Sequence, residues 1–316
     1  MIKYYKTENG KLTTLSTPEK DCWINIYPPF NHEHIRQLSE QHNIPLDFLI
    51  DSTDIDERSR FQREDGIDLI VLKTPIVNEE QNERDAIFIT IPIGIIILPE
   101  SIITISPFEN PVIDAFLNNN VKGFNTTDRR SFVLQIFDRS TFYFTYYLKE
   151  TNNERNQYEK ILYKSMRNEE LLKLLTIEKS LVYFVTSLRS NELLMLKSKR
   201  INYLNIGKDD EELNELYEDI LVDTGQALEM ANVYTNILSG TMDAFASIIN
   251  NNMNIVIKRL TSITIILSLP VIVTSVYGMN LPIPLEKSEH AFYYVLGICF
   301  ALCVLAIWYF WKKRWF

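Results

Sequence analysis

The sequence has few cysteines, which limits what can hold the fold together. Only three occur in 316 residues, at Cys22, Cys299 and Cys303. The last two are four residues apart, which places them on one face of a helix but outside the geometry that a disulfide needs within a regular helix. We therefore expect free thiols and no disulfide framework.

Motifs for nucleotide chemistry and nucleophilic catalysis are also missing. No Gly-x-x-x-x-Gly-Lys phosphate loop is present, so we expect no ATP coupling. No convincing nucleophile–base pair can be found either, and we expect neither an enzyme nor an organic cofactor. His32-Glu33-His34 could bind a metal, but histidines at an offset of two cannot share a helix face, and we expect an exposed loop there.

Positive charge is scarce in most of the chain. The formal net charge is −9, and residues 258–316 contribute +4 of it, so the first 257 residues carry −13. An acidic domain of this kind is a poor candidate for nucleic-acid binding and a plausible partner for cations.

Two segments near the C-terminus lack charge altogether. Residues 260–280 and 291–311 each contain 21 residues without Asp, Glu, Lys or Arg. A helix of that length spans about 31 Å, close to the hydrocarbon thickness of a bilayer. Two such segments predict a membrane protein with two spans.

The charges beside these segments predict their orientation. Lys258 and Arg259 precede the first span, and a basic tail, residues 312–316, follows the second. Glu286 and Glu289 outweigh Lys287 in the loop between them. The positive-inside rule then places both termini in the cytoplasm and the loop outside. The first residues have no apolar core, so we expect no secretory signal there.

The part before the spans is predicted to contain strands first and long helices afterwards. Short β-prone segments occur at residues 23–27, 68–72 and 102–106, and the very apolar run 86–98 fits one buried strand or two strands with a bulge. From residue 130 apolar side chains recur at helical spacing, in one helix to about residue 166 and in another over 171–193. These elements predict an α+β domain of the α/β/α type.

A third helix is predicted to be the longest. Asp209 and Glu212 resemble a capping box, and no proline follows until Pro270. From residue 209 to residue 280 an unbroken helix would be about 108 Å long. Such a helix would couple the acidic domain to the first span as a stalk.

One face of the first span is weakly polar. At 3.6 residues per turn one stripe contains Thr261, Thr264, Ser268, Val271 and Ser275, and it continues back to Ile257 and Asn254. Small polar residues of this kind are common where membrane helices pack, which is one interpretation. The other is a pore lined by one such helix from each of several subunits. Asn280 at the outer end favours the pore, although Asn is also a common residue at the C-terminal end of a helix.

Several segments together resemble one known family. Tyr277-Gly278-Met279-Asn280 resembles the Gly-Met-Asn signature that ends the first of two C-terminal spans in the CorA magnesium transport family. The stretches 238–243 and 252–261 and the basic, aromatic tail 309–316 resemble the family as well, and Asp56-Glu57-Arg58-Ser59-Arg60 does so more loosely. The resemblance is clearest over about the last hundred residues.

This resemblance implies a channel for hydrated Mg²⁺, with Co²⁺ as a possible second substrate. It implies a funnel-shaped homopentamer in the cytoplasmic membrane, with Gly278, Met279 and Asn280 as the selectivity filter. A ring of amide oxygens can accept hydrogen bonds from the tightly held water of Mg²⁺ without binding the ion too strongly to release it. Ile257 and Leu260 would form an apolar constriction that closes by dewetting.

The resemblance also implies regulation by intracellular Mg²⁺ bound between cytoplasmic domains. Asp219 falls where the family has a metal-sensing carboxylate, Asp223 lies one turn further on, and Asp243 lies nearer the membrane. Glu79 and Glu80 would face them from another subunit. An acidic run is more often a solvated surface, and that interpretation stays open. Glu286 and Glu289 would attract cations to the outer mouth.

The expected organisation, listed along the chain, is a cytoplasmic α/β domain (1–207), the cytoplasmic stalk (208–259), the first span (260–280), an outer loop (281–290), the second span (291–311) and the basic tail (312–316). Two alternative functions remain: a transporter of the same family that prefers Zn²⁺, Ni²⁺ or Co²⁺, and a membrane-anchored metal sensor that does not transport. The intact Gly278-Met279-Asn280 favours Mg²⁺ over the first, and the polar stripe argues against the second.

Overall fold

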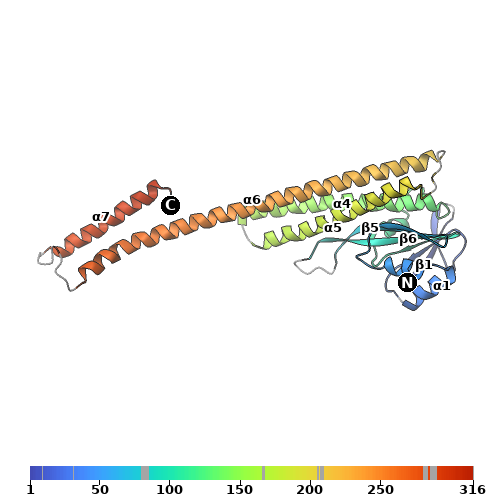
Figure 1. Cartoon of the computed structure of the whole chain (residues 1–316), viewed down its shortest axis with the longest axis horizontal. Coiled ribbons are helices and arrows are strands. Elements are labelled where there is room, and N and C mark those ends of the chain that lie inside the picture. The colour runs from blue at the N-terminus through green and yellow to red at the C-terminus, as the bar shows by residue number, and fades with distance from the viewer. Residues whose placement is uncertain are drawn as a thin grey trace. The chain divides into compact units, whose positions relative to one another are not determined.

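The computed structural model describes residues 1–8, 10–30, 32–79, 85–165, 168–204, 206, 210–279, 284 and 290–315. The chain divides into two compact units, Met1–Gly240 and Thr241–Phe316. The strands are β1 (Ile2–Glu8), β2 (Lys11–Leu15), β3 (Cys22–Ile26), β4 (Arg60–Glu64), β5 (Ile67–Val77), β6 (Phe88–Ile97) and β7 (Ser101–Ile105). The helices are α1 (His32–His42), α2 (Leu46–Asp51), α3 (Pro111–Leu117), α4 (Arg129–Ser165), α5 (Asn168–Arg200), α6 (Glu211–Tyr277) and α7 (Ala291–Lys312) (Figure 1).

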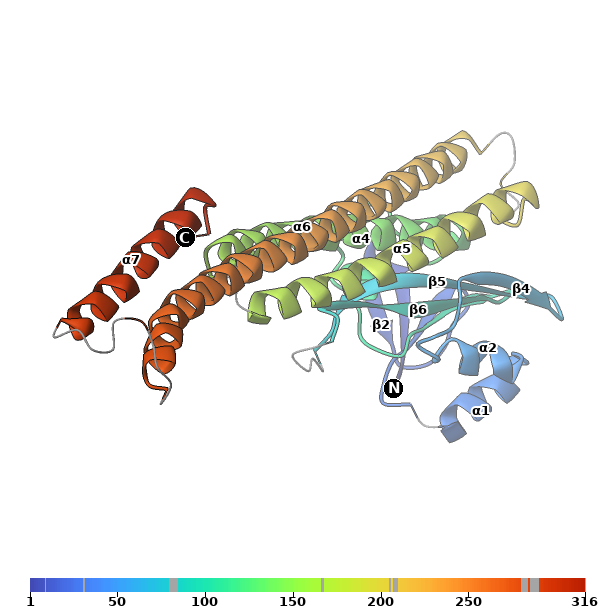
Figure 2. The same ribbon diagram turned by 60° about the vertical axis from the view of Figure 1, so that its left-hand side comes forward.

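The first unit is built on one mixed sheet of seven strands. Their order is β2-β1-β3-β7-β6-β5-β4, and only β3 and β7 run parallel to each other. Helices α1 and α2 lie on one face of this sheet, and α4 and α5 lie on the other (Figure 2). The predicted α/β/α architecture is therefore confirmed.

Burial on both faces explains why the central strands are almost continuously apolar. Along β5, Ile70 and Leu72 belong to the core under α3–α5, whereas Leu69 and Val71 belong to the core under α1 and α2. A sheet covered on both faces needs apolar side chains at successive positions, not at alternate ones. The run 86–98, for which we predicted one strand or two, contains the single strand β6.

Pro92 occurs inside β6 because its missing N–H is not needed there. Pro92 is opposite Lys73 in the register of β5 and β6, and pairing with β7 begins only at Gly94. The backbone of Lys73 bonds instead to the Asn191 side chain, with N–H donating at 2.9 Å and C=O accepting at 2.8 Å. The amide of Asn191 thus completes the strand with a helix side chain.

The long helices agree with the predicted periodicity. α4 begins and ends within about one residue of the predicted limits, α5 begins at Asn168 and extends beyond the predicted range to Arg200, and α6 is continuous over 67 residues. In the first unit α6 buries Tyr217, Ile220, Ala227, Ala231 and Leu238. The proposed cap residue Asp209 lies outside the described residues.

One local prediction was wrong. His32-Glu33-His34 forms the first turn of α1, not a loop. The helix forms because Ile35 and Leu38, further along it, are buried against the sheet. Tertiary burial of these side chains outweighed the polar character of the first turn.

Gly94 is required by the close approach of α2 to the sheet. A Cβ atom at Gly94 would lie 2.0 Å from Ser52 Oγ and 3.0 Å from Ile105 Cγ2. Ser52 cannot move away easily, because it is fully buried and its hydroxyl donates to the carbonyl of Phe48 at 2.6 Å.

We therefore expect Gly94→Ala to destabilise the first unit by about 1–3 kcal/mol, the usual cost of overpacking a core. Gly240→Ala is the matched control, since no atom lies within 4 Å of a Cβ there and alanine favours a helix. Thermal unfolding of the purified full-length protein, followed by circular dichroism, should show a lower midpoint for the first variant only. Equal midpoints would mean that α2 moves away from the added methyl group without a loss of stability.

Candidate ion-conducting and cation-sensing sites

The second unit contains α7 and the last part of α6. Both are long and apolar enough to cross a membrane. α7 runs back beside the C-terminal end of α6 (Figures 1 and 2). The thiol of Cys303 in α7 donates to the carbonyl oxygen of Ile266 in α6 at 3.7 Å. This contact places Cys303 of α7 at the level of Ile266 of α6.

The same contact compensates for the proline in α6. Pro270 has no N–H, so the carbonyl of Ile266, four residues earlier, lacks its usual helical donor. In a membrane such a group costs free energy unless a neighbouring helix or side chain satisfies it. Cys303 supplies that donor, and α6 continues past Pro270 to Tyr277.

The predicted polar stripe lies on the side of α6 away from α7. Ser262 is fully buried, and Ile266, Val273 and Tyr277 are half-buried, which identifies the face covered by α7. At about 100° per residue, all eight predicted pore-lining residues fall within about 70° of the opposite side. Ser268 is half-buried and the others are exposed: Asn254, Ile257, Leu260, Thr261, Thr264, Val271 and Ser275.

Two hydroxyls of the stripe have their protons committed to the helix. Thr264 Oγ1 donates to the carbonyl of Leu260 at 2.9 Å, and Ser268 Oγ donates to that of Thr264 at 2.7 Å. Each oxygen therefore keeps lone pairs for a further partner and has no proton left to donate. Such a surface accepts hydrogen bonds, which suits the water shell of a cation.

The predicted filter is described only in part. α6 ends at Tyr277, the N–H of Gly278 donates to the Thr274 carbonyl at 2.9 Å, and Met279 is 53% exposed. A Cβ at Gly278 would lie 3.3 Å from the same carbonyl, so the glycine fits closely against the last turn. Asn280 lies outside the described residues, as do Glu286 and Glu289 of the outer loop.

The predicted sensor carboxylates that the structure describes lie on the surface. Asp219, Asp223, Asp243 and Glu79 are all exposed, and Glu80 lies outside the described residues. Among the described residues no group of three or more His, Cys, Asp or Glu side chains is placed to hold a metal ion. A cation at these carboxylates would need ligands from water or from a second copy of the chain.

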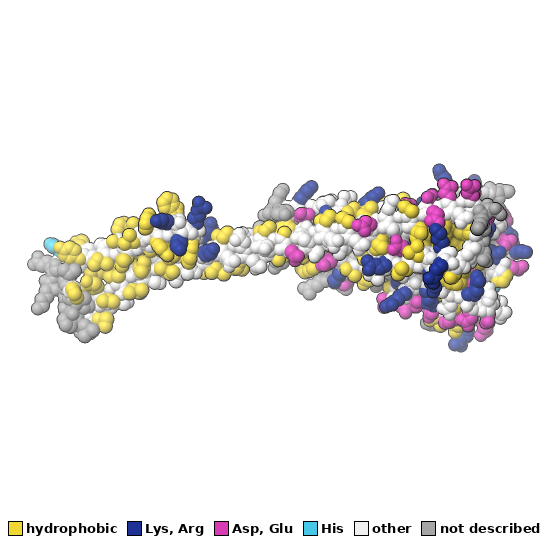
Figure 3. All heavy atoms as spheres, turned by 45° about the horizontal axis from the view of Figure 1, so that its top comes forward, with side chains coloured by type: hydrophobic (Ala, Val, Ile, Leu, Met, Phe, Trp, Pro, Cys, Tyr) yellow, Lys and Arg dark blue, Asp and Glu magenta, His cyan; other side chains and the backbone are white. Residues whose placement is uncertain are grey.

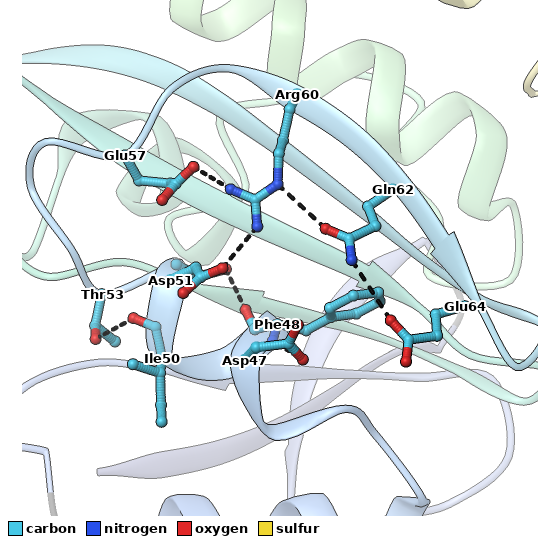
Figure 4. A network of polar contacts seen from close by, with 10 residues as sticks. Asp47, Phe48, Ile50, Asp51, Thr53, Glu57, Arg60, Gln62 and Glu64 are labelled. Carbon is cyan, nitrogen blue, oxygen red and sulfur yellow. Dashed lines mark hydrogen bonds and ion pairs between the residues drawn. The ribbon is translucent and has the colours of Figure 1, made fainter.

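The segment around Asp56 and Arg60 has a structural role that the sequence did not reveal. Figure 4 shows Arg60 of β4 between Glu57 and Asp51. Arg60 forms ion pairs with both carboxylates, and its Nη2 lies 2.8 Å from Asp51 Oδ2. Lys73 of β5 donates to the carbonyl of Ile55 in the same loop. Burial lowers the pKa of Lys73, and Asp56 is the first of three nearby carboxylates that oppose this shift. The acidic loop thus closes over a buried amine.

Comparison with known proteins places these features in a family. A family model described as "CorA-like Mg2+ transporter protein" matches residues 19–314. The chain belongs to this CorA family. Members of the family are Mg²⁺ and Co²⁺ transporters and not enzymes, and the fold and the two apolar helices agree with a membrane transporter.

Individual CorA relatives extend the comparison. The cobalt/magnesium transport protein CorA of Methanocaldococcus jannaschii is 28% identical over 298 residues, which cover 93% of this chain and 90% of the relative. The complete structure of the CorA magnesium transporter from that organism superposes with a TM-score of 0.84 at 25% identity, covering 100% of this chain and 99% of that one. The full-length CmaX structure shares the fold with a TM-score of 0.73 at 16% identity, covering 100% and 98% of the two chains.

The bond between Cys303 and Ile266 can be tested by stability. Cys303→Ala should destabilise the second unit by about 0.5–1.5 kcal/mol, because the Ile266 carbonyl loses a donor. Cys303→Ser keeps a donor and should retain most of the stability. Cys299→Ala, one turn earlier on α7, removes a buried thiol and controls for lost packing. Unfolding midpoints in detergent that are equal for Cys303→Ala and Cys299→Ala would show that the bond contributes nothing.

Proposed function

We propose that this chain assembles as a homopentamer that conducts hydrated Mg²⁺, with Co²⁺ as a second substrate, and that intracellular Mg²⁺ closes it. The observation that carries the proposal is the polar stripe of α6. It faces away from α7, which leaves it free to line a space shared with other copies. The relative from Methanocaldococcus jannaschii, which matches 93% of this chain, is named as a cobalt/magnesium transport protein, and this supports the choice of ions.

The stripe suits an ion that keeps its water. Mg²⁺ dehydrates reluctantly, and its bound waters present protons outward. The oxygens of Thr264 and Ser268 accept such protons, and no carboxylate on the stripe would hold the ion tightly. A ring of Asn280 amides at the outer end, set by Gly278 and Met279, would select the hydrated ion.

Toward the N-terminal end of the span, the same face of α6 carries the apolar side chains Ile257 and Leu260. Ile257 and Leu260 are 52% and 64% exposed in one chain, so a ring of either would present hydrocarbon to the pore. An apolar ring excludes water when narrow and wets when widened, which makes it a gate.

Charge repulsion supplies the regulatory force. Five copies of residues 1–257, at −13 each, would carry −65. Cations between Asp219, Asp223 or Asp243 of one copy and Glu79 or Glu80 of the next would screen this repulsion and hold the stalks together. Loss of Mg²⁺ would let the stalks separate. The basic flanks support a cytoplasmic position for this acidic part and an outer position for Glu286 and Glu289.

The choice of Mg²⁺ over the alternative ions rests on the Gly-Met-Asn signature, because the fold does not distinguish between these ions. The cytoplasmic domain of ZntB from Vibrio parahaemolyticus superposes with a TM-score of 0.61, but at 14% identity this shows the fold alone. Gly278-Met279-Asn280 is intact in this chain. Uptake of Mg²⁺ but not Zn²⁺ into liposomes, blocked by cobalt hexammine, would distinguish this proposal from a Zn²⁺ transporter and from a sensor.

Asn280→Ala should abolish Mg²⁺ flux and leave the oligomer assembled, because it removes only the amide ring. Flux is measured with a Mg²⁺-sensitive dye in liposomes, and assembly by size-exclusion chromatography with light scattering. Asn251→Ala is the control, since Asn251 is an exposed asparagine of α6 on the side away from the stripe. Near-normal flux in a correctly assembled Asn280→Ala protein would contradict the pore assignment.

Asp219→Lys should make the closed form independent of Mg²⁺. The lysine would place a cation where the metal is proposed to bind. Each exposed ion pair that it forms would stabilise the closed form by at most about 1 kcal/mol, and the pair would occur in every subunit. The wild type should resist limited proteolysis in millimolar Mg²⁺ and lose this protection in chelator, whereas the variant should stay protected in both. Glu8→Lys makes the same charge change at an exposed position of β1 and should behave as wild type. Full Mg²⁺ dependence in Asp219→Lys would mean that sensing uses other carboxylates.

A further inference from the structure

We propose that Lys258, Arg259, Lys312, Lys313 and Arg314 form a binding site for the headgroup of an anionic phospholipid. The site is made by both helices of the second unit, and all five side chains are exposed. Figure 3 shows Lys and Arg side chains of this unit gathered in one place, with apolar surface beyond them. The proposal rests on α6 and α7 as membrane spans and not on which ion is conducted.

The bond between Cys303 and Ile266 brings the five cations to one level. Lys312 lies nine residues after Cys303, and Lys258 lies eight residues before Ile266. Since the helices run in opposite directions, these spacings of about 13.5 Å and about 12 Å lead to the same height. A single plane of positive charge therefore crosses both helices where their apolar segments end.

The two cations of α6 face the α7 side and not the proposed pore. Ser262 marks the covered face, and its hydroxyl donates to the carbonyl of Lys258, one turn earlier, at 2.8 Å. At about 100° per residue, Lys258 and Arg259 flank the direction of Ser262 by about 40° and about 60°. The stripe points the other way, so the cluster is directed to the lipid side of α6.

Aromatic rings lie directly beside the cations of α7. Lys312 Nζ lies 5.2 Å from the ring centre of Trp308, and Lys313 Nζ lies 6.0 Å from that of Tyr309. Trp308 and Tyr309 are themselves more than half exposed. Tryptophan and tyrosine are favoured at the depth of lipid headgroups, where the ring is apolar and its edge is polar. A phosphate held by the cations would have its glycerol and upper acyl chain against these rings.

Acidic side chains are missing from the sequence on either side of these cations. Residues 244–285 and 290–316 contain no Asp or Glu, and no ion pair joins any of the five cations to a described residue. Each Lys or Arg near an anionic membrane surface adds about fivefold to lipid affinity. The anion that fits this depth, charge and aromatic surround is a phospholipid headgroup.

The tryptophans at the C-terminal end, Trp308, Trp311 and Trp315, allow a direct test by fluorescence. The chain has four tryptophans, at positions 23, 308, 311 and 315, so Trp23→Phe leaves emission from the tail alone. Full-length protein with this change is placed in phosphatidylcholine vesicles containing a minor fraction of phosphatidylglycerol, with either lipid brominated to quench nearby tryptophans. We expect brominated phosphatidylglycerol to quench on the order of tenfold more than its share of the lipid.

Three variants make the result decisive. Neutralising all five residues (K258Q/R259Q/K312Q/K313Q/R314Q) should reduce quenching to the share of the lipid. K258R/K312R/K313R keeps the charge and should keep the preference, and K11Q/K122Q/K160Q neutralises exposed lysines of the first unit and should have no effect. Proportional quenching in the wild type, or a preference that survives in the fivefold variant, would overturn the proposal. Release of the lipid by millimolar inorganic phosphate would show a site for phosphate alone and would overturn it too.

Discussion

A membrane supplies no hydrogen-bond partners, and the second unit is arranged around that constraint. Every backbone carbonyl within a span must find a donor in the protein. In α6, Pro270 removes the helical donor of the Ile266 carbonyl, and the thiol of Cys303 in α7 donates to that carbonyl. The hydroxyl groups of Thr264 and Ser268 need partners as well, and they donate to carbonyls of their own helix. The constraint thus decides how α7 is aligned and which polar atoms the stripe can offer to a hydrated ion.

The first unit answers a different constraint, which is the covering of one sheet on both faces. The central strands are apolar at most successive positions, and a buried polar side chain such as Thr104 has hydrogen-bond partners there, in its case Trp23 and Asn25. Polar groups also complete the sheet where strand pairing ends. Asn191 of α5 bonds the backbone of Lys73 where β4 no longer pairs with β5. The Lys73 side chain, in turn, reaches the acidic loop that precedes β4. The exposed carboxylates therefore give this unit its acidic surface, whereas the buried amine of Lys73 holds the acidic loop against the core.

The sequence predicted elements whose pattern is local and repeated. Helical spacing over dozens of residues located α4, α5 and α6, and two uncharged segments located the spans. Contacts between distant residues could not be predicted in this way. Gly94 is explained only by Ser52, 42 positions earlier, and nothing near Cys303 in the sequence points to Ile266. The first turn of α1 was missed for the same reason, since its stability comes from burial of Ile35 and Leu38. The pore-lining role of the stripe stays a prediction, because a ring of subunits cannot be derived from one chain.

Within residues 254–277, two faces of α6 differ in charge: the face away from α7 has no charged side chain, and the face toward α7 carries Lys258 and Arg259. On the uncovered face α6 presents hydroxyl oxygens and apolar side chains without charge. On the covered side, one turn before Ser262, it presents Lys258 and Arg259. In the proposed pore, cations directed inward would repel the conducted ions, whereas cations beside α7 would be placed to meet lipid phosphates. The alignment that satisfies the carbonyl of Ile266 also brings the basic end of α7 to the same height. The level at which α7 meets α6 therefore bears on both proposals, the uncharged path for cations and the binding site for anionic lipid.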